Sequence, residues 1–322
     1  MKKLLTVITV FILALTCTFT LISCDTADFT VGICQLVTHD ALDAATQGFM
    51  DALEEEVTKA GKTVKFDLQN AQNAPDTCTL IVNKFVAKQV DLILANATPA
   101  LDAARSATKT IPVLGTSITE YGVALGRDDI VGGVVGGNIS GTSDLAPLSQ
   151  QAQMVIDLVP SAQKVGLLYC SGEANSKFQV DEVKRILEQA GKTCTVYTFT
   201  DTTDITAIAE NAASNSDVIY VPTDNTVAHN TSVIDAACRK HNVPVIAGEE
   251  GICKGCGIAT LSISYYNLGV ITGKMAAKIL LEGAEIATMK IAYDEQPVYK
   301  YDKERCELYG IAVPANYTEL ER

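Results

Sequence analysis

The chain has 322 residues, and its 25 lysines and arginines against 38 aspartates and glutamates give a formal net charge of −13 at pH 7. A chain this acidic, without a basic stripe, is a poor candidate for binding nucleic acid. About 300 residues follow the N-terminal segment. A chain of this length usually divides into more than one hydrophobic core, so we expect two lobes.

The N-terminus has the layout of a secretory signal. Lys2 and Lys3 precede an apolar stretch from Leu4 to Ile22, and acidic residues follow it instead of a basic stop-transfer cluster. The segment LISC, which ends at Cys24, resembles the lipobox of bacterial lipoproteins, whose cysteine receives a diacylglycerol and becomes the new N-terminus. We expect residues 1–23 to be a signal peptide and Cys24 the lipidation site, which would anchor the protein to the cell membrane on its outer side. The alternative is a plain signal peptide with an incidental cysteine.

The segment after the signal predicts a strand–helix–strand unit. FTVGICQLV (29–37) is strand-like, ALDAATQGFMDALEEEVTKAG (41–61) has an apolar stripe with helical spacing, and TVKFDLQNA (63–71) alternates as a strand does. Hydrophobic runs and helical patterns continue to alternate along the chain, which favours a parallel α/β sheet.

The same plan restarts near the middle of the chain. KVGLLYC (164–170) leads to a helical pattern at 176–191 and to the strand-like KTCTVYTFT (192–200). Both helical patterns end in Ala-Gly-Lys-Thr, where the glycines suit a left-handed helix end. Two further pairs of segments also match, 90–101 with 216–227 and 111–117 with 244–250. The sequence thus predicts one lobe plan used twice.

The predicted lobes are joined by more than one connection. NISGTSDLAPLS (138–149) is the natural crossover, because it is rich in Gly, Ser, Thr and Pro. A helical pattern at 266–283 and a strand-like one at 289–301 follow the second copy. We expect an α/β fold with two similar parallel-sheet lobes and a multi-crossover hinge. The expected bounds are 24–145 with about 262–286 for lobe 1, and 146–261 with about 287–322 for lobe 2.

Eight cysteines follow Cys24, and they are spread through predicted strands and helices, which is typical of buried thiols. CKGC (253–256) contains the one close pair, which we interpret as a loop pair or a local disulfide. A zinc site needs four ligands, and the chain has three histidines. We therefore expect neither a metal nor a cofactor.

Ligands of open parallel sheets bind beyond the carboxyl ends of the strands. The six segments at those ends contain no lysine or arginine and many acids and neutral hydrogen-bonding groups. A single carboxylate can still be held at a helix N-terminus, where Thr98 can cap and Pro99 fits the first helical position. An ammonium group would meet Asp224 or a glutamate, so the pattern favours a zwitterion such as an amino acid. The candidates from these segments are Gln35, His39, Thr98, Thr116, Ser117, Asn175, Ser176, Asp224, Asn225 and Glu249.

Signatures of catalysis are weak. The chain has no G-x-S-x-G elbow and no Walker loop, and His39 is the only histidine at a predicted strand end. We expect a binding protein; a secreted hydrolase-like enzyme is the less favoured alternative.

Several phrases resemble one family of solute-binding lipoproteins of ABC transporters. They are QLVTHDALDAATQGF, ATPAL, NISGTSDLAPLSQQ, SGEANS, VPTDNTV and PVIAGEEG. The resemblance implies the type I periplasmic-binding-protein fold with three crossovers, hinge closure on a ligand, and delivery to a permease and its ATPase without catalysis. It also implies an aromatic amino acid such as tryptophan or phenylalanine as ligand. By motif, it implies ligand contacts at Thr98, Pro99, Ala100, Thr142, Ser143, Asp144, Asn175, Ser176, Asp224 and Asn225. A nucleoside-binding lipoprotein of the same fold remains the alternative.

Overall fold

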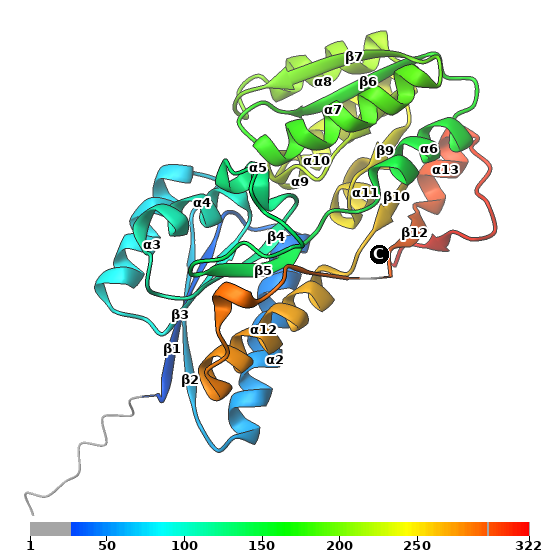
Figure 1. Cartoon of the computed structure of the whole chain (residues 1–322). Helices are drawn as coiled ribbons and strands as arrows, with labels where there is room; N and C mark the ends of the chain where they lie inside the picture. The colour runs from blue at the N-terminus through cyan, green and yellow to red at the C-terminus, as the bar shows by residue number, and fades with distance from the viewer. Residues whose placement is uncertain (1–26, 295, 322) are drawn as a thin grey trace, which may run out of the picture.

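The computed structural model of the chain describes residues 27–294 and 296–321, which form two α/β lobes (Figure 1). The expected signal peptide and Cys24 lie outside the described residues. Among those residues, no helix combines the length and the apolar character that a membrane span requires.

The first lobe contains a six-stranded parallel sheet in the order β11-β5-β4-β3-β1-β2. Its strands are β1 (Phe29–Gln35), β2 (Val64–Asn70), β3 (Leu92–Asn96), β4 (Val113–Ile118), β5 (Ile139–Ser143) and β11 (Ala292–Tyr293). Its helices are α2 (Asp40–Lys59), α3 (Pro75–Ala87), α4 (Thr98–Ala107), α5 (Tyr121–Leu125) and α12 (Tyr265–Glu282), with a short 3₁₀ turn at Ile286–Thr288.

The second lobe contains a seven-stranded sheet in the order β13-β12-β10-β9-β8-β6-β7, parallel except where β10 meets β12. Its strands are β6 (Lys164–Cys170), β7 (Thr193–Phe199), β8 (Val218–Val221), β9 (Val245–Ala247), β10 (Ala259–Ser262), β12 (Val298–Tyr301) and β13 (Thr318–Glu319). Its helices are α6 (Leu148–Leu158), α7 (Ala174–Gln189), α8 (Ile205–Asn215), α9 (Asn225–His229), α10 (Thr231–His241), α11 (Glu250–Cys256) and α13 (Lys303–Tyr309).

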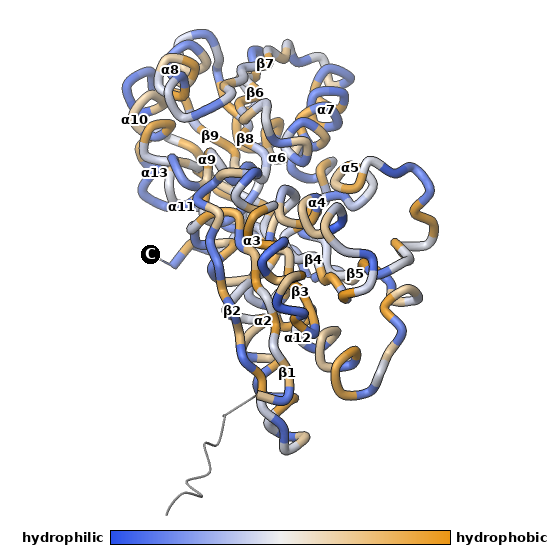
Figure 2. Tube along the Cα trace, turned by 90° about the vertical axis from the view of Figure 1, so that its left-hand side faces the viewer, coloured by the Kyte–Doolittle hydropathy of each residue, from blue (hydrophilic) through white to orange (hydrophobic). Residues whose placement is uncertain are grey.

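The duplicated plan is confirmed by the strand orders. β2-β1-β3-β4 in the first sheet corresponds to β7-β6-β8-β9 in the second. The helix-ending glycines Gly61 and Gly191 have φ angles of 70° and 81°, a left-handed conformation that glycine adopts without steric cost. Each sheet is covered on both faces, which explains why central strands such as β3 and β8 are mostly hydrophobic (Figure 2).

Alternate residues of β1 show how the two faces are covered. Val31 and Ile33 join a cluster with Phe49 of α2 and Met275 of α12, whereas Cys34 faces the cluster on the α3 side of the sheet. Helix α2 and helix α12 lie side by side against the first of these faces (Figure 1). Because α2 starts beside the hinge, this packing fixes where the N-terminal end of α2 meets the second lobe.

The hinge has three crossovers, which confirms the expected architecture. The chain passes between the lobes from β5 to α6, from β10 to α12 and from β11 to β12. Two expected bounds need correction. The first half of the predicted crossover 138–149 is the buried strand β5, and β11 pairs with β5, so lobe 1 extends to Tyr293 instead of ending at about 286. In both cases a short strand is identified only by the partner strand beside it.

The cysteine at each described position is free, and all are buried except the half-buried Cys194. Cys253 and Cys256 do not form the expected loop pair or local disulfide. Both lie on α11 and pack into the core of the second lobe, and their burial raises the pKa of each thiol well above its usual value.

Candidate ligand-binding site

A small cavity lies between the lobes, at the carboxyl ends of strands from both sheets. The space open to a water-sized sphere is about 10 Å³, roughly the room of one water molecule, so the walls must move apart before a ligand of amino-acid size can enter. Lobe 1 and its hinge segments contribute His39, Leu42, Ser117, Thr119, Asp144 and Tyr265, and lobe 2 contributes Asn175, Thr223, Asp224, Asn225, Ala228 and Glu249.

Seven of the fifteen residues expected from the sequence line this cavity, namely His39, Ser117, Asp144, Asn175, Asp224, Asn225 and Glu249. The other eight do not line it and lie in surrounding layers: Gln35, Thr98, Pro99, Ala100, Thr116, Thr142, Ser143 and Ser176. Several of these hold the wall in place. Ser143 donates to the carbonyl of Thr119 over 2.9 Å, and the hydroxyl of Thr142 contacts that of Thr116 over 3.2 Å.

The expectation that Thr98 caps α4 needs correction. Ala97 is the N-cap residue, no side chain caps the helix, and Pro99 is the second helical residue. Ala97 has φ 89°, an unusual value for a residue with a Cβ, and its N–H donates to the carbonyl of Thr116 over 3.1 Å. This hydrogen bond ties the start of α4 to β4, beside the cavity, and holds Ala97 in its strained conformation.

Four buried polar atoms of the cavity wall have no hydrogen-bond partner in the protein: Asp144 Oδ1, Asn175 Oδ1, His39 Nδ1 and Ser117 Oγ. An unpaired buried polar group costs about 1–3 kcal/mol. Four such atoms around one cavity therefore indicate a polar ligand that supplies the missing partners.

Among the acidic residues that line the cavity, Asp144 has a carboxylate oxygen without a hydrogen-bond partner. The Tyr265 hydroxyl donates to Oδ2 over 2.9 Å, while Oδ1 has no partner. Burial raises the pKa of the Asp144 carboxyl, and the hydrogen bond from Tyr265 opposes this shift. A cationic group placed against Oδ1 would stabilise the ionised form.

Asn175 also offers an acceptor. Its Nδ2 donates to the carbonyl of Thr223 over 3.0 Å and faces the Glu173 carboxylate, and both of these groups only accept. Because Nδ2 must face them, Oδ1 is the amide atom left without a partner, as observed.

Asp224 is a helix cap as well as part of the wall. Its Oδ1 accepts from the N–H of Val227 and its Oδ2 from the N–H of Cys170, each over 2.8 Å. Burial, and then the nearby Glu173, raise the pKa of the Asp224 carboxyl well above its usual value. With both oxygens already engaged, Asp224 has less capacity for a ligand ammonium than Asp144 does.

Glu173, which the sequence did not single out, organises the second-lobe side of the site. Its carboxylate is buried and accepts from the N–H and side-chain amide of Asn225 and from the N–H and hydroxyl of Thr226. It thereby covers the N-terminal end of α9. The only sequence signal was its place in the strand-end segment YCSGEANS.

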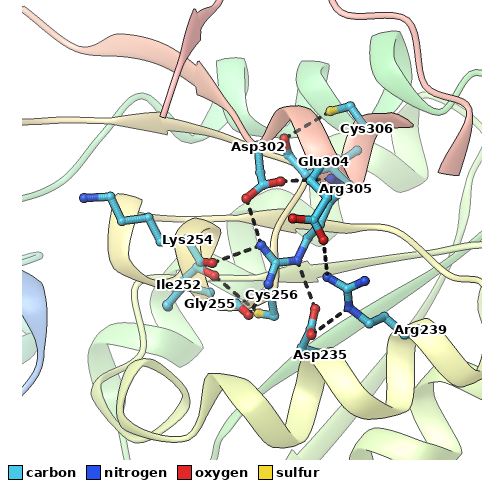
Figure 3. Close-up of polar contacts among 11 residues, drawn as sticks. Asp235, Arg239, Ile252, Lys254, Gly255, Cys256, Asp302, Glu304, Arg305 and Cys306 are labelled. Atoms are coloured by element: carbon cyan, nitrogen blue, oxygen red, sulfur yellow. Dashed lines mark hydrogen bonds and ion pairs between the residues drawn. The ribbon is translucent and has the colours of Figure 1, made fainter. Parts of the chain in front are cut away.

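Glu249 caps α11 by accepting from the N–H groups of Gly251 and Ile252. Burial raises the pKa of Glu249 to about 7, and these two hydrogen bonds oppose the shift. The carboxyl end of α11 is held by the buried Arg305, whose guanidinium donates to the carbonyls of Lys254 and Gly255 and to Asp235 and Asp302 (Figure 3). The helix that presents Glu249 is therefore fixed at both ends.

A larger hollow of about 720 Å³, partly open to solvent, lies beside the hinge and shares Glu249 and Tyr265 with the cavity. Its lysines, Lys254 and Lys300, both pair with Glu250. None of the buried unpaired polar atoms belongs to its lining among the described residues. We therefore take the smaller cavity as the candidate site.

Residues 30–314 match the sequence profile of the family described as ABC transporter substrate binding protein. The chain belongs to this family. Its members are substrate-binding proteins and not enzymes, which confirms the expectation of a non-catalytic role, and those of ABC importers work outside the cytoplasm.

Three similar proteins cover most of the chain. A tyrosine-binding protein of Clostridioides difficile (strain R20291) is 34% identical over 267 residues, which is 81% of this chain and 75% of that protein. The ABC domain from Streptococcus pneumonia in complex with L-Trp is 31% identical, with a TM-score of 0.84, and the match covers 90% of this chain and 97% of that one. The ligand-free, open structure of CD0873, a substrate binding protein with adhesive properties from Clostridium difficile, is 33% identical with a TM-score of 0.68, covering 91% and 99%.

Proposed function

We propose that the protein captures an aromatic amino acid between its lobes and delivers it to an ABC permease and its ATPase. The single observation that carries the ligand class is the set of unpaired acceptors in the cavity, at Asp144, Asn175 and His39. An ammonium group has three N–H donors and no acceptor, so it matches this set in number and charge. The tyrosine and L-Trp ligands of the two relatives support the same class.

The remaining features of the cavity suit the rest of an amino acid. The Ser117 hydroxyl is unpaired and buried, so it can donate to a carboxylate. Leu42, Ala228 and the ring of Tyr265 supply apolar surface for a side chain. Lysine and arginine do not line the cavity, which disfavours ligands with a phosphate or several carboxylates.

Closure of the lobes is part of the proposal. Contacts between the lobes include His229 Nδ1 with the carbonyl of Thr38 over 3.0 Å and Asn73 Nδ2 with the hydroxyl of Thr226 over 3.1 Å. The chain is also more similar in shape to the L-Trp complex than to the open structure, at nearly equal identity. These observations support a hinge whose closed form a ligand stabilises.

The experiment that tests the ligand class is thermal unfolding of the purified protein against a panel of amino acids, nucleosides and sugars. A ligand that binds only the native state raises the unfolding temperature according to its occupancy. We expect increases with L-tryptophan, L-tyrosine or L-phenylalanine. An increase with nucleosides alone would replace the proposal with the nucleoside-binding alternative.

We also propose that Cys24 carries the lipid anchor that keeps the protein beside its permease, since a diacyl group gives stable membrane attachment. The Cys24→Ser variant is expected to leave the membrane fraction. Equal membrane retention of the variant and the unchanged protein would contradict this.

A further inference from the structure

A hydrogen-bond relay across the cleft fixes which nitrogen of His39 carries its proton. His39 precedes α2 in lobe 1, and its Nε2 lies 3.3 Å from Asn225 Oδ1 in lobe 2. Asn225 Nδ2 donates to Glu173 Oε2 over 2.8 Å, and a carboxylate only accepts hydrogen bonds. The amide of Asn225 is therefore oriented with its oxygen toward His39.

This orientation determines the tautomer of the imidazole. Because Asn225 presents an oxygen, Nε2 of His39 must carry the hydrogen, and Nδ1 of the neutral ring is then an acceptor. Nδ1 is buried, has no partner in the protein, and belongs to a residue that lines the cavity. The relay Glu173–Asn225–His39 thus presents the lone pair of Nδ1 to the ligand. Because His39 and Asn225 belong to different lobes, the relay forms only when the lobes are closed.

We propose that His39 makes ligand capture depend on pH: in its neutral form it accepts a hydrogen bond from the ligand's ammonium through Nδ1, and its protonation at acidic pH releases the ligand. This inference rests on the proposed function, because it needs a ligand that donates. A protonated His39 has no free acceptor and places a positive charge against the ammonium. Closure on the ligand therefore requires His39 to give up its proton.

The charged and titratable groups around His39 come from several elements. They are Asp40 and Asp43 on α2, Asp144 after β5, Glu173 before α7, Asp224 and His229 around α9, Glu249 and Lys254 around α11, and Tyr265 on α12. Burial lowers the pKa of His39, and this effect exceeds the opposing influence of Asn225, Glu173, Asp43 and Asp40. A bound ammonium lowers the pKa of His39 further.

The sign of the pH effect follows from this lowering. The closed form disfavours the charged imidazole, so binding is unimpaired above the ordinary pKa range of histidine and is lost as the pH falls below it. In that range one proton is released for each ligand bound, which raises Kd about tenfold for each unit by which the pH falls. Burial of Glu249, whose pKa is about 7, acts in the opposite direction, because closure favours its protonated form.

The test is calorimetric titration with L-tryptophan, L-tyrosine and L-phenylalanine from pH 5 to pH 8, for the unchanged protein, His39→Asn and the control His241→Asn. His241 ends α10 and bonds to Glu210, away from the cavity. We expect the Kd of the unchanged protein and of the control to rise as the pH falls, and that of His39→Asn to vary much less. Identical pH profiles for all three proteins would overturn the proposal.

A second measurement is independent of affinity. Long-range ¹H–¹⁵N NMR of the ligand complex at pH 8 is expected to show His39 protonated at Nε2 and not at Nδ1. The Nδ1–H tautomer would overturn the relay even where amino acids bind. Binding of none of the three amino acids at pH 8 would instead refute the proposed function, and the inference with it.

Discussion

At the scale of single residues, the site depends on which carboxylate has a free oxygen. The sequence suggested Asp224 for the ammonium because of its strand-end position. In the structure, backbone N–H groups engage both of its oxygens, while Asp144 Oδ1 is unpaired. Asp144 directly follows β5, but the sequence pattern indicated a crossover there, so the strand-end rule did not select it and only the family resemblance did.

The Asp144→Asn variant is expected to lose ligand affinity, because it keeps the size of the side chain and removes the charge opposite the ammonium. Loss of one partner of a buried charge pair costs about 2–5 kcal/mol, or about thirtyfold or more in Kd. Calorimetric titration measures this loss, and Asp157→Asn, an exposed aspartate of α6, is the control. A larger loss of affinity in Asp224→Asn than in Asp144→Asn would show that Asp224, and not Asp144, binds the ammonium.

At the scale of elements, the contact between α2 and α12 depends on glycines. A Cβ on Gly269 would lie 2.1 Å from the carbonyl oxygen of Ala45, and one on Gly48 would lie 2.2 Å from that of Tyr266. The two helices therefore approach backbone to backbone. The helical pattern at 266–283 predicted α12 but could not show its partner, since a glycine in a helix has the same appearance whether or not another helix touches it.

The Gly269→Ala variant is expected to destabilise the protein, although alanine is the better helix former by about 1 kcal/mol. Forcing a methyl group into this contact costs about 1–3 kcal/mol beyond that gain. Urea unfolding measures the change, and Lys274→Ala on the exposed side of α12 is the control. Unchanged or increased stability of Gly269→Ala would show that the helices do not approach this closely.

At the scale of the whole molecule, the repeated sequence pattern predicted the two similar parallel-sheet lobes and the hinge between them. It did not predict β5, whose sequence ISGTS is polar and glycine-containing and resembles a linker, and it did not separate β11 from β12 within the strand-like segment 289–301. It also missed Glu173, whose importance comes from the N–H groups of Asn225 and Thr226, about fifty positions along the chain. Features that depend on local periodicity were accessible from the sequence; those that depend on which segments meet were not.

The central claim is that the closed cleft recognises the ammonium of an aromatic amino acid. The most direct measurement is calorimetric titration of the purified protein at pH 8 with L-tyrosine and L-tryptophan and with their N-acetyl derivatives, which lack the ammonium. We predict binding of at least one free amino acid at a single site and no binding of its N-acetyl derivative. Equal affinity for the free and acetylated forms, or binding of neither, would contradict the claim.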